Sequence, residues 1–265
     1  VYEPSVVNTV ANTLEVGICI EAEVTTALKA LIQPINVVLL TALAQTLKQW
    51  SNSTTLTLDV ESHGRRVWDD ALDLSRTVGW FTALYPLRLS LPSMSLTEQL
   101  TRIKEQINQV PNGGVGYGVL RAQLGQGAGS HASGETPKSP AQVSFNYLGE
   151  LTLPATGVVT GLAPEPVTAL KSPQCQRQYL LEIVALIQNR QLQIRWRYSQ
   201  KQYHQKTIEQ LSKRFYSNLK SLMAESSSDQ SASSQSASAA NFAAASVNSG
   251  QLNKLMNKLK AKGGA

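Results

Sequence analysis

The segment from Pro34 to about Trp50 most constrains what this chain can fold into. Proline is tolerated in the first turn of a helix, so Pro34 is well placed to open one. The residues that follow are apolar on nearly every side, and residues 37–40 read Val-Val-Leu-Leu. A helix without a polar face must be buried by other elements. The 265 residues, 42% of them hydrophobic, are enough to build such a core.

Alternating apolar and polar residues predict strands elsewhere in the chain. From Thr54 to Glu61 the apolar residues share one face, which places Glu61 at a strand end on the polar face. Tyr179–Gln188 and Gln191–Tyr198 are predicted to form an antiparallel hairpin, because both alternate and only two residues separate them. Further strands are expected at 79–91 and 143–148.

Periodic spacing predicts three more helices, over Glu21–Ile32, from Ser95 to about Val110 and over Gln205–Met223. The second begins with Ser-Leu-Thr-Glu, a capping-box pattern. Residues 1–18 show no clear period, and the turn-rich residues 125–137 are expected to form a mobile loop.

The composition changes after Glu225, and this change predicts the domain organisation. Residues 1–224 are expected to form the folded domain. Serine and alanine dominate residues 225–250, which we expect to be a flexible linker. Residues 251–265 carry an apolar stripe among lysines and are expected to form a short amphipathic helix that docks between domains.

The charge and the cysteines narrow the function classes. The net charge of +6 favours an acidic partner. No Lys/Arg-rich run points to nucleic acid, and no apolar run is long enough to span a membrane. Cys19 and Cys175 have neither metal nor redox spacing and are expected to be buried thiols of a cytoplasmic protein. The first residue is Val rather than Met, so we expect a segment of a longer polypeptide.

Four motifs occur in order along the chain. Residues 61–65 read Glu-Ser-His-Gly-Arg, 76–82 Arg-Thr-Val-Gly-Trp-Phe-Thr, 111–118 Pro-Asn-Gly-Gly-Val-Gly-Tyr-Gly, and 145–149 Phe-Asn-Tyr-Leu-Gly. Over about residues 15–224 they resemble the signature motifs of epimerization domains of nonribosomal peptide synthetases, which belong to the condensation-domain superfamily. Condensation domains usually lack the Arg-Thr-Val-Gly-Trp-Phe-Thr sequence found at 76–82, so the resemblance favours epimerization.

The resemblance implies the fold of chloramphenicol acetyltransferase, in which two lobes form a V around an active-site tunnel. The N-terminal lobe of the family carries a His-His-x-x-x-Asp-Gly motif, whereas the histidines here are His63, His131 and His204. The chain therefore resembles only the C-terminal lobe, an α+β unit with a mixed β-sheet and flanking helices. Two departures are Ser62, where the family has Gly, and Arg66, where an acid is usual.

Epimerization at a thioester removes a proton from Cα and returns one to the opposite face, so two flanking groups are expected. The resemblance implies Glu61 for one face and a His of the N-terminal lobe for the other. Arg76 could stabilise the enolate oxygen or organise the tunnel. The alternative for Arg76 is an ion pair with Asp73 or Asp59.

Four other residues are candidates for the substrate tunnel. Asn146 and Tyr147 could line its wall, since a polar tip on an apolar body suits a cleft. His63 is better suited to hold its turn by hydrogen bonding than to act as a second base. Trp80 is expected to shape the strand and the core, with the tunnel wall as the alternative.

The resemblance also implies the partners. The substrate would arrive on the 4'-phosphopantetheine of a peptidyl carrier domain, and that cofactor belongs to the carrier, so the chain itself binds none. Carrier domains tend to be acidic, which fits the basic balance. Residues 241–255 resemble the linker that leads into an adjacent synthetase module.

The implied function is inversion of Cα in a carrier-bound aminoacyl or peptidyl thioester. This half alone would be inactive, because one base is missing. The alternatives are a lobe of an amide-forming condensation domain and a non-catalytic lobe that docks a carrier.

Overall fold

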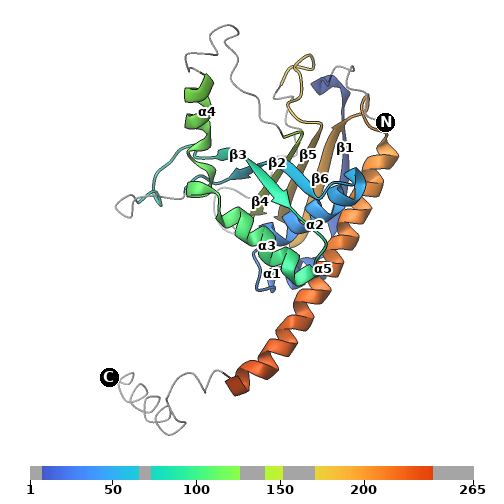
Figure 1. The fold of residues 1–265 in the computed structure, drawn as a ribbon. Coiled ribbons are helices and arrows are strands. Elements are labelled where there is room, and N and C mark those ends of the chain that lie inside the picture. Colours follow the sequence, from blue (N-terminus) through green and yellow to red (C-terminus); the bar gives the residue numbers. More distant parts are fainter. Residues whose placement is uncertain (1–7, 66–72, 126–140, 152–170, 241–265) are drawn as a thin grey trace, which may run out of the picture.

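The computed structural model describes residues 8–65, 73–125, 141–151 and 171–240 (Figure 1). In these ranges the strands form one mixed sheet in the order β1-β6-β5-β4-β2-β3. β4 runs parallel to both β2 and β5, and the other neighbours are antiparallel. The strands are β1 Thr13–Ile20, β2 Thr55–Ser62, β3 Ala83–Ser90, β4 Val143–Leu151, β5 Leu181–Gln188 and β6 Gln191–Ser199. The expected α+β class with a mixed sheet is confirmed.

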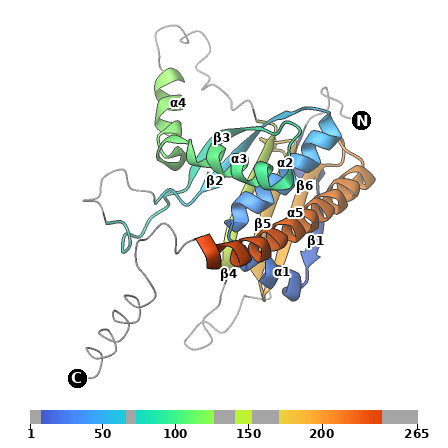
Figure 2. The same ribbon diagram turned by 60° about the horizontal axis from the view of Figure 1, so that its bottom comes forward.

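Helices cover one face of this sheet (Figures 1 and 2). α2 packs against both α3 and α5 and also contacts β2. Its residues 37–47 are all buried, which confirms the prediction of an enclosed apolar helix. The helical elements are η1 Val10–Asn12, α1 Ala22–Lys29, α2 Ile35–Ser51, α3 Leu96–Asn108, η2 Pro111–Gly114, α4 Tyr117–Gly125 and α5 Gln205–Ala240.

Local sequence rules explain several element ends. α3 begins at a complete capping box, in which the Ser95 hydroxyl accepts from the backbone N–H of Glu98 and the Glu98 carboxylate accepts from that of Ser95. α2 ends where Asn52 adopts a left-handed conformation. The predicted hairpin is confirmed as β5 and β6, which turn at Asn189 and Arg190, both with positive φ.

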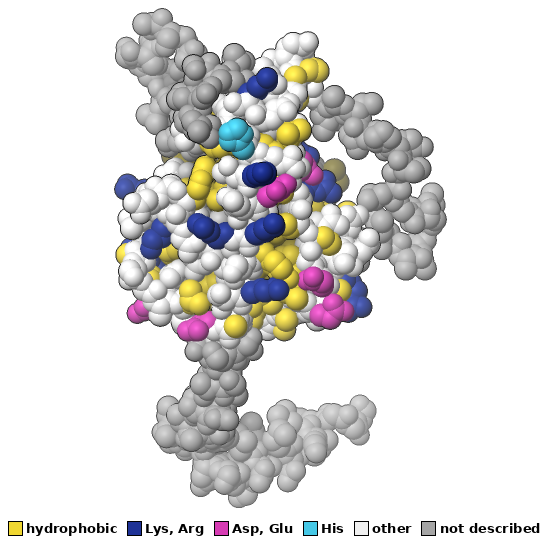
Figure 3. All heavy atoms as spheres, turned by 90° about the vertical axis from the view of Figure 1, so that its right-hand side faces the viewer, with side chains coloured by type: hydrophobic (Ala, Val, Ile, Leu, Met, Phe, Trp, Pro, Cys, Tyr) yellow, Lys and Arg dark blue, Asp and Glu magenta, His cyan; other side chains and the backbone are white. Residues whose placement is uncertain are grey.

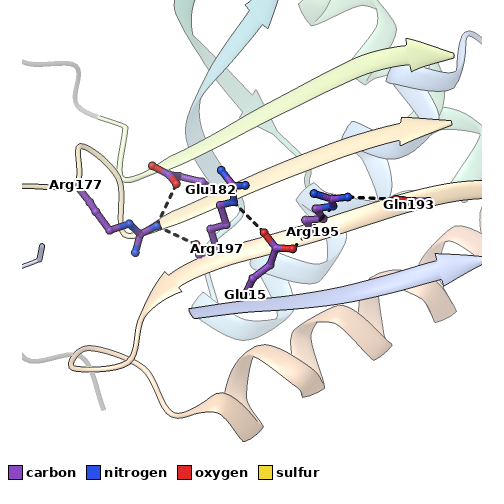
Figure 4. Close-up of polar contacts among 6 residues, drawn as sticks. All are labelled: Glu15, Arg177, Glu182, Gln193, Arg195 and Arg197. Atoms are coloured by element: carbon purple, nitrogen blue, oxygen red, sulfur yellow. Dashed lines mark hydrogen bonds and ion pairs between the residues drawn. The ribbon is translucent and has the colours of Figure 1, made fainter. Parts of the chain in front are cut away.

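On the other face of the sheet, β1, β5 and β6 carry charged side chains (Figure 4). Glu15 accepts from Arg197 at 2.9 Å and lies 3.9 Å from Arg195, while Arg177 lies 3.3 Å from Glu182. The side chains of Glu15, Arg195 and Arg197 are 39–47% exposed, so these pairs contribute little to stability. Figure 3 shows Lys and Arg side chains spread among apolar ones on the right-hand side of Figure 1, not gathered in one patch.

Two strand predictions need correction. β1 was missed because it is an edge strand whose burial pattern is irregular, with only Ile20 fully buried. The strand expected from Gly79 begins only at Ala83. Residues 79–82 instead form a loop that ties back to the end of β2, where the Arg65 guanidinium lies 4.5 Å from the centroid of the Phe81 ring.

The helix expected over Gln205–Met223 is longer in the structure, while the expected division into domain, linker and docking helix stays a prediction. α5 continues to Ala240, through most of the segment expected to be a linker over 225–250. Residues 205–240 contain neither Gly nor Pro, so no strong helix breaker interrupts a helix that is nucleated on the core. Residues 251–265 and most of the expected loop at 125–137 lie outside the described residues.

The cysteine prediction is wrong as well. Cys19 and Cys175 are both free and exposed. Cys19 lies on the face of β1 that points away from the helices, opposite Gln193 of β6, and Cys175 lies in the loop before β5. In the described part of the chain, no helix combines the length and the apolar character needed to cross a membrane.

Candidate active site

A cavity of about 740 Å³ opens at the carboxyl ends of the neighbouring parallel strands β2 and β4. Ligands of sheets with parallel strands commonly bind at this edge. Apolar residues from both sheet and helices form part of its wall, among them Leu40, Val60, Leu87 and Phe145. Its polar side is lined by Glu61, Ser62, His63, Asn146 and Tyr147. Five of the six predicted site and tunnel residues therefore line one cavity, namely Glu61, His63, Asn146, Tyr147 and Trp80.

The strand register explains why Glu61 meets Asn146. Val60 pairs with Phe145 in the parallel ladder, and both side chains belong to the buried core. Successive side chains alternate between faces, so the next residues, Glu61 and Asn146, project together from the other face. The Asn146 amide nitrogen donates a hydrogen bond to Glu61 Oε2.

The electrostatic surroundings of Glu61 suit a base. Partial burial against the cavity wall raises the pKa of the Glu61 carboxyl, and the hydrogen bond from Asn146 lowers that pKa by less. A carboxylate with a raised pKa accepts a proton more readily near neutral pH. Glu61 is nevertheless open to solvent, and a base must be accessible in this way if it is to reach a substrate.

The turn after β2 is held by its own residues. Gly64 has φ +62°, and a Cβ at this position would lie 1.5 Å from the carbonyl oxygen of Phe81. The backbone N–H of Arg65 donates to His63 Nδ1 at 3.0 Å. His63 thus holds the turn, the role that the sequence favoured, and it also lines the cavity.

Arg65 anchors the loop that follows. Its Nη1 donates to the carbonyl oxygens of Leu74 and Thr77, both at 2.9 Å, and its guanidinium stacks on Phe81. These contacts position the loop that carries Trp80. Trp80 is 91% exposed and lines the cavity, so the expectation that it shapes the core is wrong and the alternative, the cavity wall, describes its place.

The motif at 111–118 contacts β3, and its Gly113 lines the same cavity. The Ser62 hydroxyl donates to the carbonyl oxygen of Gly113 at 3.1 Å. Gly114 has φ +85°, and a Cβ there would lie 1.9 Å from the Tyr85 ring, which lines the cavity. The glycines thus form a tight turn into α4, as predicted.

Arg76 is the one predicted catalytic residue that lies apart. It is exposed, in a turn, and is not among the residues that line the 740 Å³ cavity. Asp73 accepts from the backbone N–H of Ser75 at 2.9 Å, which lowers the pKa of its carboxyl. A catalytic role for Arg76 stays a prediction. The alternative for Arg76, an ion pair with Asp73 or Asp59, also stays a prediction.

The sequence did not single out Tyr179, which the structure places against Asp59. Its hydroxyl donates to Asp59 Oδ2 at 2.7 Å, and both residues are buried. Burial and the nearby carboxylates raise the pKa of Tyr179 far above its ordinary value, so it stays protonated. The alternation that placed Asp59 on the same face as Glu61 was the available signal. No three His, Cys, Asp or Glu side chains in the described ranges cluster to hold a metal ion.

Comparisons with known proteins identify the family. The model of the condensation domain family matches residues 3–241. One of the linear gramicidin synthase proteins of Brevibacillus parabrevis is 37% identical over 238 residues, which cover 86% of this chain and 3% of that protein. Surfactin synthase subunit 1 of Bacillus subtilis (strain 168) is 34% identical over 185 residues, 69% of this chain and 5% of that protein. The chain thus spans only a few per cent of the length of these relatives.

Solved structures support the same assignment. The epimerization domain from the third module of tyrocidine synthetase B is similar with a TM-score of 0.72 and 26% identity, over 85% of this chain and 51% of that one. A nonribosomal peptide synthetase in an AMPPNP-bound form shares the fold with a TM-score of 0.58 and 17% identity, over 82% of this chain and 22% of that one. The α+β architecture matches a chloramphenicol-acetyltransferase-like lobe. With a family model that spans nearly its whole length, this chain belongs to the condensation domain family.

Proposed function

We propose that this chain supplies the Glu61 half of an epimerization centre, which inverts Cα of an aminoacyl or peptidyl thioester. The observation that carries the proposal is the pair of Glu61 and Asn146 at the rim of the 740 Å³ cavity. Glu61 has the raised pKa of a working base, and Asn146 orients its carboxylate through a hydrogen bond to one of the two oxygens.

In the proposed reaction Glu61 takes the proton from Cα, and the electron pair of the broken C–H bond moves into the thioester carbonyl to form an enolate. A proton returned to the opposite face of Cα restores the thioester with inverted configuration. The second group would come from outside this chain, and the resemblance implies a His of the N-terminal lobe. The carrier's phosphopantetheine would bring the thioester, so this chain needs no cofactor of its own.

Tyr147 is our candidate for the group that faces the developing negative charge. It lines the cavity two positions from Phe145 in β4, and burial together with the nearby Glu150 raises the pKa of its hydroxyl. A phenol with a raised pKa remains protonated and can donate a hydrogen bond to an enolate oxygen.

The similarity to the tyrocidine epimerization domain and the motif at 76–82 favour this activity over others of the family. The test uses the complete domain, in which this chain is joined to the N-terminal lobe that the resemblance implies. An aminoacyl-loaded carrier is incubated with it in D2O, and deuterium at Cα and the L/D ratio are measured by mass spectrometry and chiral analysis.

We expect deuterium uptake with inversion in the wild type and a loss of about 100-fold or more in Glu61→Gln, since a positioned base contributes roughly 10²–10⁴-fold. The matched control is Glu15→Gln, the same change at a partly exposed carboxylate of β1, which should exchange as the wild type does. Uptake that survives Glu61→Gln would remove Glu61 from the reaction.

A condensation lobe is the second candidate, and the match to the condensation domain family model favours it. In that reaction the amine of a second carrier-bound amino acid would attack the thioester, forming an amide and releasing the first carrier's thiol. Peptide formation with two loaded carriers and no deuterium uptake would establish condensation. If the domain shows neither deuterium uptake nor peptide formation, the remaining alternative is a non-catalytic lobe that docks a carrier.

A further inference from the structure

We infer that the apolar part of the 740 Å³ cavity binds the side chain of the amino acid at the reacting Cα, and that it selects apolar side chains. This inference rests on the proposed function, because it assigns a further part of the same substrate. It applies to aminoacyl and peptidyl thioesters alike, since both carry this side chain. The side-chain subsite is lined by Ile35, Leu40, Val60, Tyr85, Ile107 and Phe145.

The subsite opens where strands β2 and β4 part. In the described strands their parallel pairing ends at Val60 and Phe145. Beyond this pair β2 continues along β3 and β4 continues along β5. Residues that follow the pair on both strands, among them Ser62 and Tyr147, line the cavity. Glu61 and Val60 point to opposite faces of the sheet yet line this same cavity, so the opening between the strands connects the Glu61 carboxylate with the subsite.

The subsite combines a closed floor with open apolar sides. Leu40 of α2 and Phe145 of β4 are 2% and 1% exposed and close the floor. Ile35 at the start of α2 and Ile107 near the end of α3 are half-buried, so part of their apolar surface is open to a ligand. An apolar cavity of about 150 Å³ is enough to hold benzene. The whole cavity therefore has room for an aliphatic or aromatic side chain together with the thioester.

The charges around the cavity favour an apolar side chain. The acidic and basic groups among the described lining residues are Glu61, at the end of β2, and His63, just after it. The proposed function assigns Glu61 to Cα, so a charged substrate side chain in the subsite would lose its water without gaining a countercharge. An apolar side chain instead gains free energy with each methylene group that is buried.

A fixed side chain is compatible with inversion at Cα. Removal of the proton leaves a planar enolate, and the side chain lies in this plane while the two faces stay accessible to the two proton-transferring groups. The subsite begins at Val60, the neighbour of Glu61 in β2. It can therefore hold the side chain while the proton leaves one face and another returns to the opposite face.

The test measures binding, with probes that cannot react. Each probe is an N-acetyl-aminoacyl-pantetheine in which an amide replaces the thioester. The amino acid is leucine, asparagine or alanine, and leucine and asparagine differ little in size but strongly in polarity. We expect the complete domain to bind the leucine probe about 10-fold or more tightly than either other probe. Asn36 also lines the cavity, and an asparagine probe that binds as tightly as the leucine probe would overturn the inference.

Ile107→Phe tests the position of the subsite. Ile107 borders open space, so the larger ring can extend into the cavity and take the place of the substrate side chain. We expect the leucine probe to weaken by about 10-fold and the alanine probe by less than about threefold. The matched control is Leu96→Phe, at a half-buried position of α3 that is not among the described lining residues. Equal losses for both probes in Ile107→Phe, or no loss for either, would overturn the inference.

A measurement on the unmodified domain covers the case in which Ile107→Phe does not fold. The leucine probe is labelled with ¹³C at its methyl groups, and nuclear Overhauser effects from them to the domain are recorded. We expect contacts to the methyl groups of Ile35, Val60 and Ile107, and contacts only elsewhere in the domain would contradict the inference. Deuterium exchange in Glu61→Gln tests the proposed function separately, since the probes carry no reactive thioester.

Discussion

Neighbouring residues of β2 and β4 differ in how much they contribute to the core and how much they offer for chemistry. Val60 and Phe145 belong to the buried core and are 8% and 1% exposed, and they form part of the apolar wall of the cavity. Glu61 and Asn146, one residue further along each strand, point to the other face and line the polar side of the same cavity. The same parallel register aligns both pairs. Substitutions one position apart should therefore lower the stability of the domain by very different amounts, and this contrast can be tested directly.

The largest expected effect compares Phe145→Ala with Asn146→Ala in the complete domain. Phe145 lies in the core, so its truncation should lower the free energy of unfolding by about 3–5 kcal/mol. Asn146→Ala should lower it by about 1 kcal/mol or less but should reduce deuterium exchange, because Glu61 loses its orienting donor. Chemical denaturation and exchange measure the two effects. Equal stability losses would break the distinction between the faces.

The second comparison lies within one motif, between Gly114→Ala and Gly116→Ala. A Cβ at Gly114 would enter the Tyr85 ring, and its φ of +85° is strained for alanine, whereas a Cβ at Gly116 meets nothing within 4 Å. We expect Gly114→Ala to cost roughly 1–3 kcal/mol and to disturb the cavity wall, and Gly116→Ala to be close to neutral. Thermal denaturation of both variants checks this, and a tolerant Gly114 would show that η2 does not set the wall.

Arg65→Lys should loosen the loop at 74–82 that Arg65 anchors while leaving strand β2 unchanged. Lysine keeps the charge but lacks the planar fork that reaches two carbonyl oxygens and stacks on Phe81. We expect a loss of about 1 kcal/mol and faster amide hydrogen exchange confined to residues 74–82. Exchange that quickens across β2 and β4 as well would mean that Arg65 supports the sheet itself.

The smallest expected effect is the pH dependence of stability at Glu61. Its pKa is raised in the folded domain, so the folded state holds the proton more tightly than the unfolded chain. The wild type should then lose a little stability as the pH rises from the ordinary Glu pKa through the raised one, whereas Glu61→Gln should not. Because Glu61 is open to solvent, the difference should be small. Denaturation at several pH values measures it, and an opposite slope would contradict the raised pKa.

The elements with strong periodicity could be predicted from the sequence. The buried α2, the capping box of α3 and the hairpin of β5 and β6 follow from patterns that local physics imposes. β1 could not be predicted, because an edge strand with one open face shows no clean alternation. The length of α5 was misjudged because composition alone does not reveal that a helix is already nucleated on a core.

For the candidate site, the sequence by itself determined the residue types and their local placement. It put Glu61 at a strand end on a polar face, and its motifs pointed to Asn146 and Tyr147. Only the tertiary structure decided that β2 lies beside β4 in a parallel register, which brings Glu61 and Asn146 together across 85 residues of chain. It also decided that Trp80 is exposed beside the cavity, that Arg76 lies apart and that Asp59 is buried under Tyr179. The reason is that spacing along a chain dictates which face a side chain takes, whereas strand order and register depend on how all the elements pack at once.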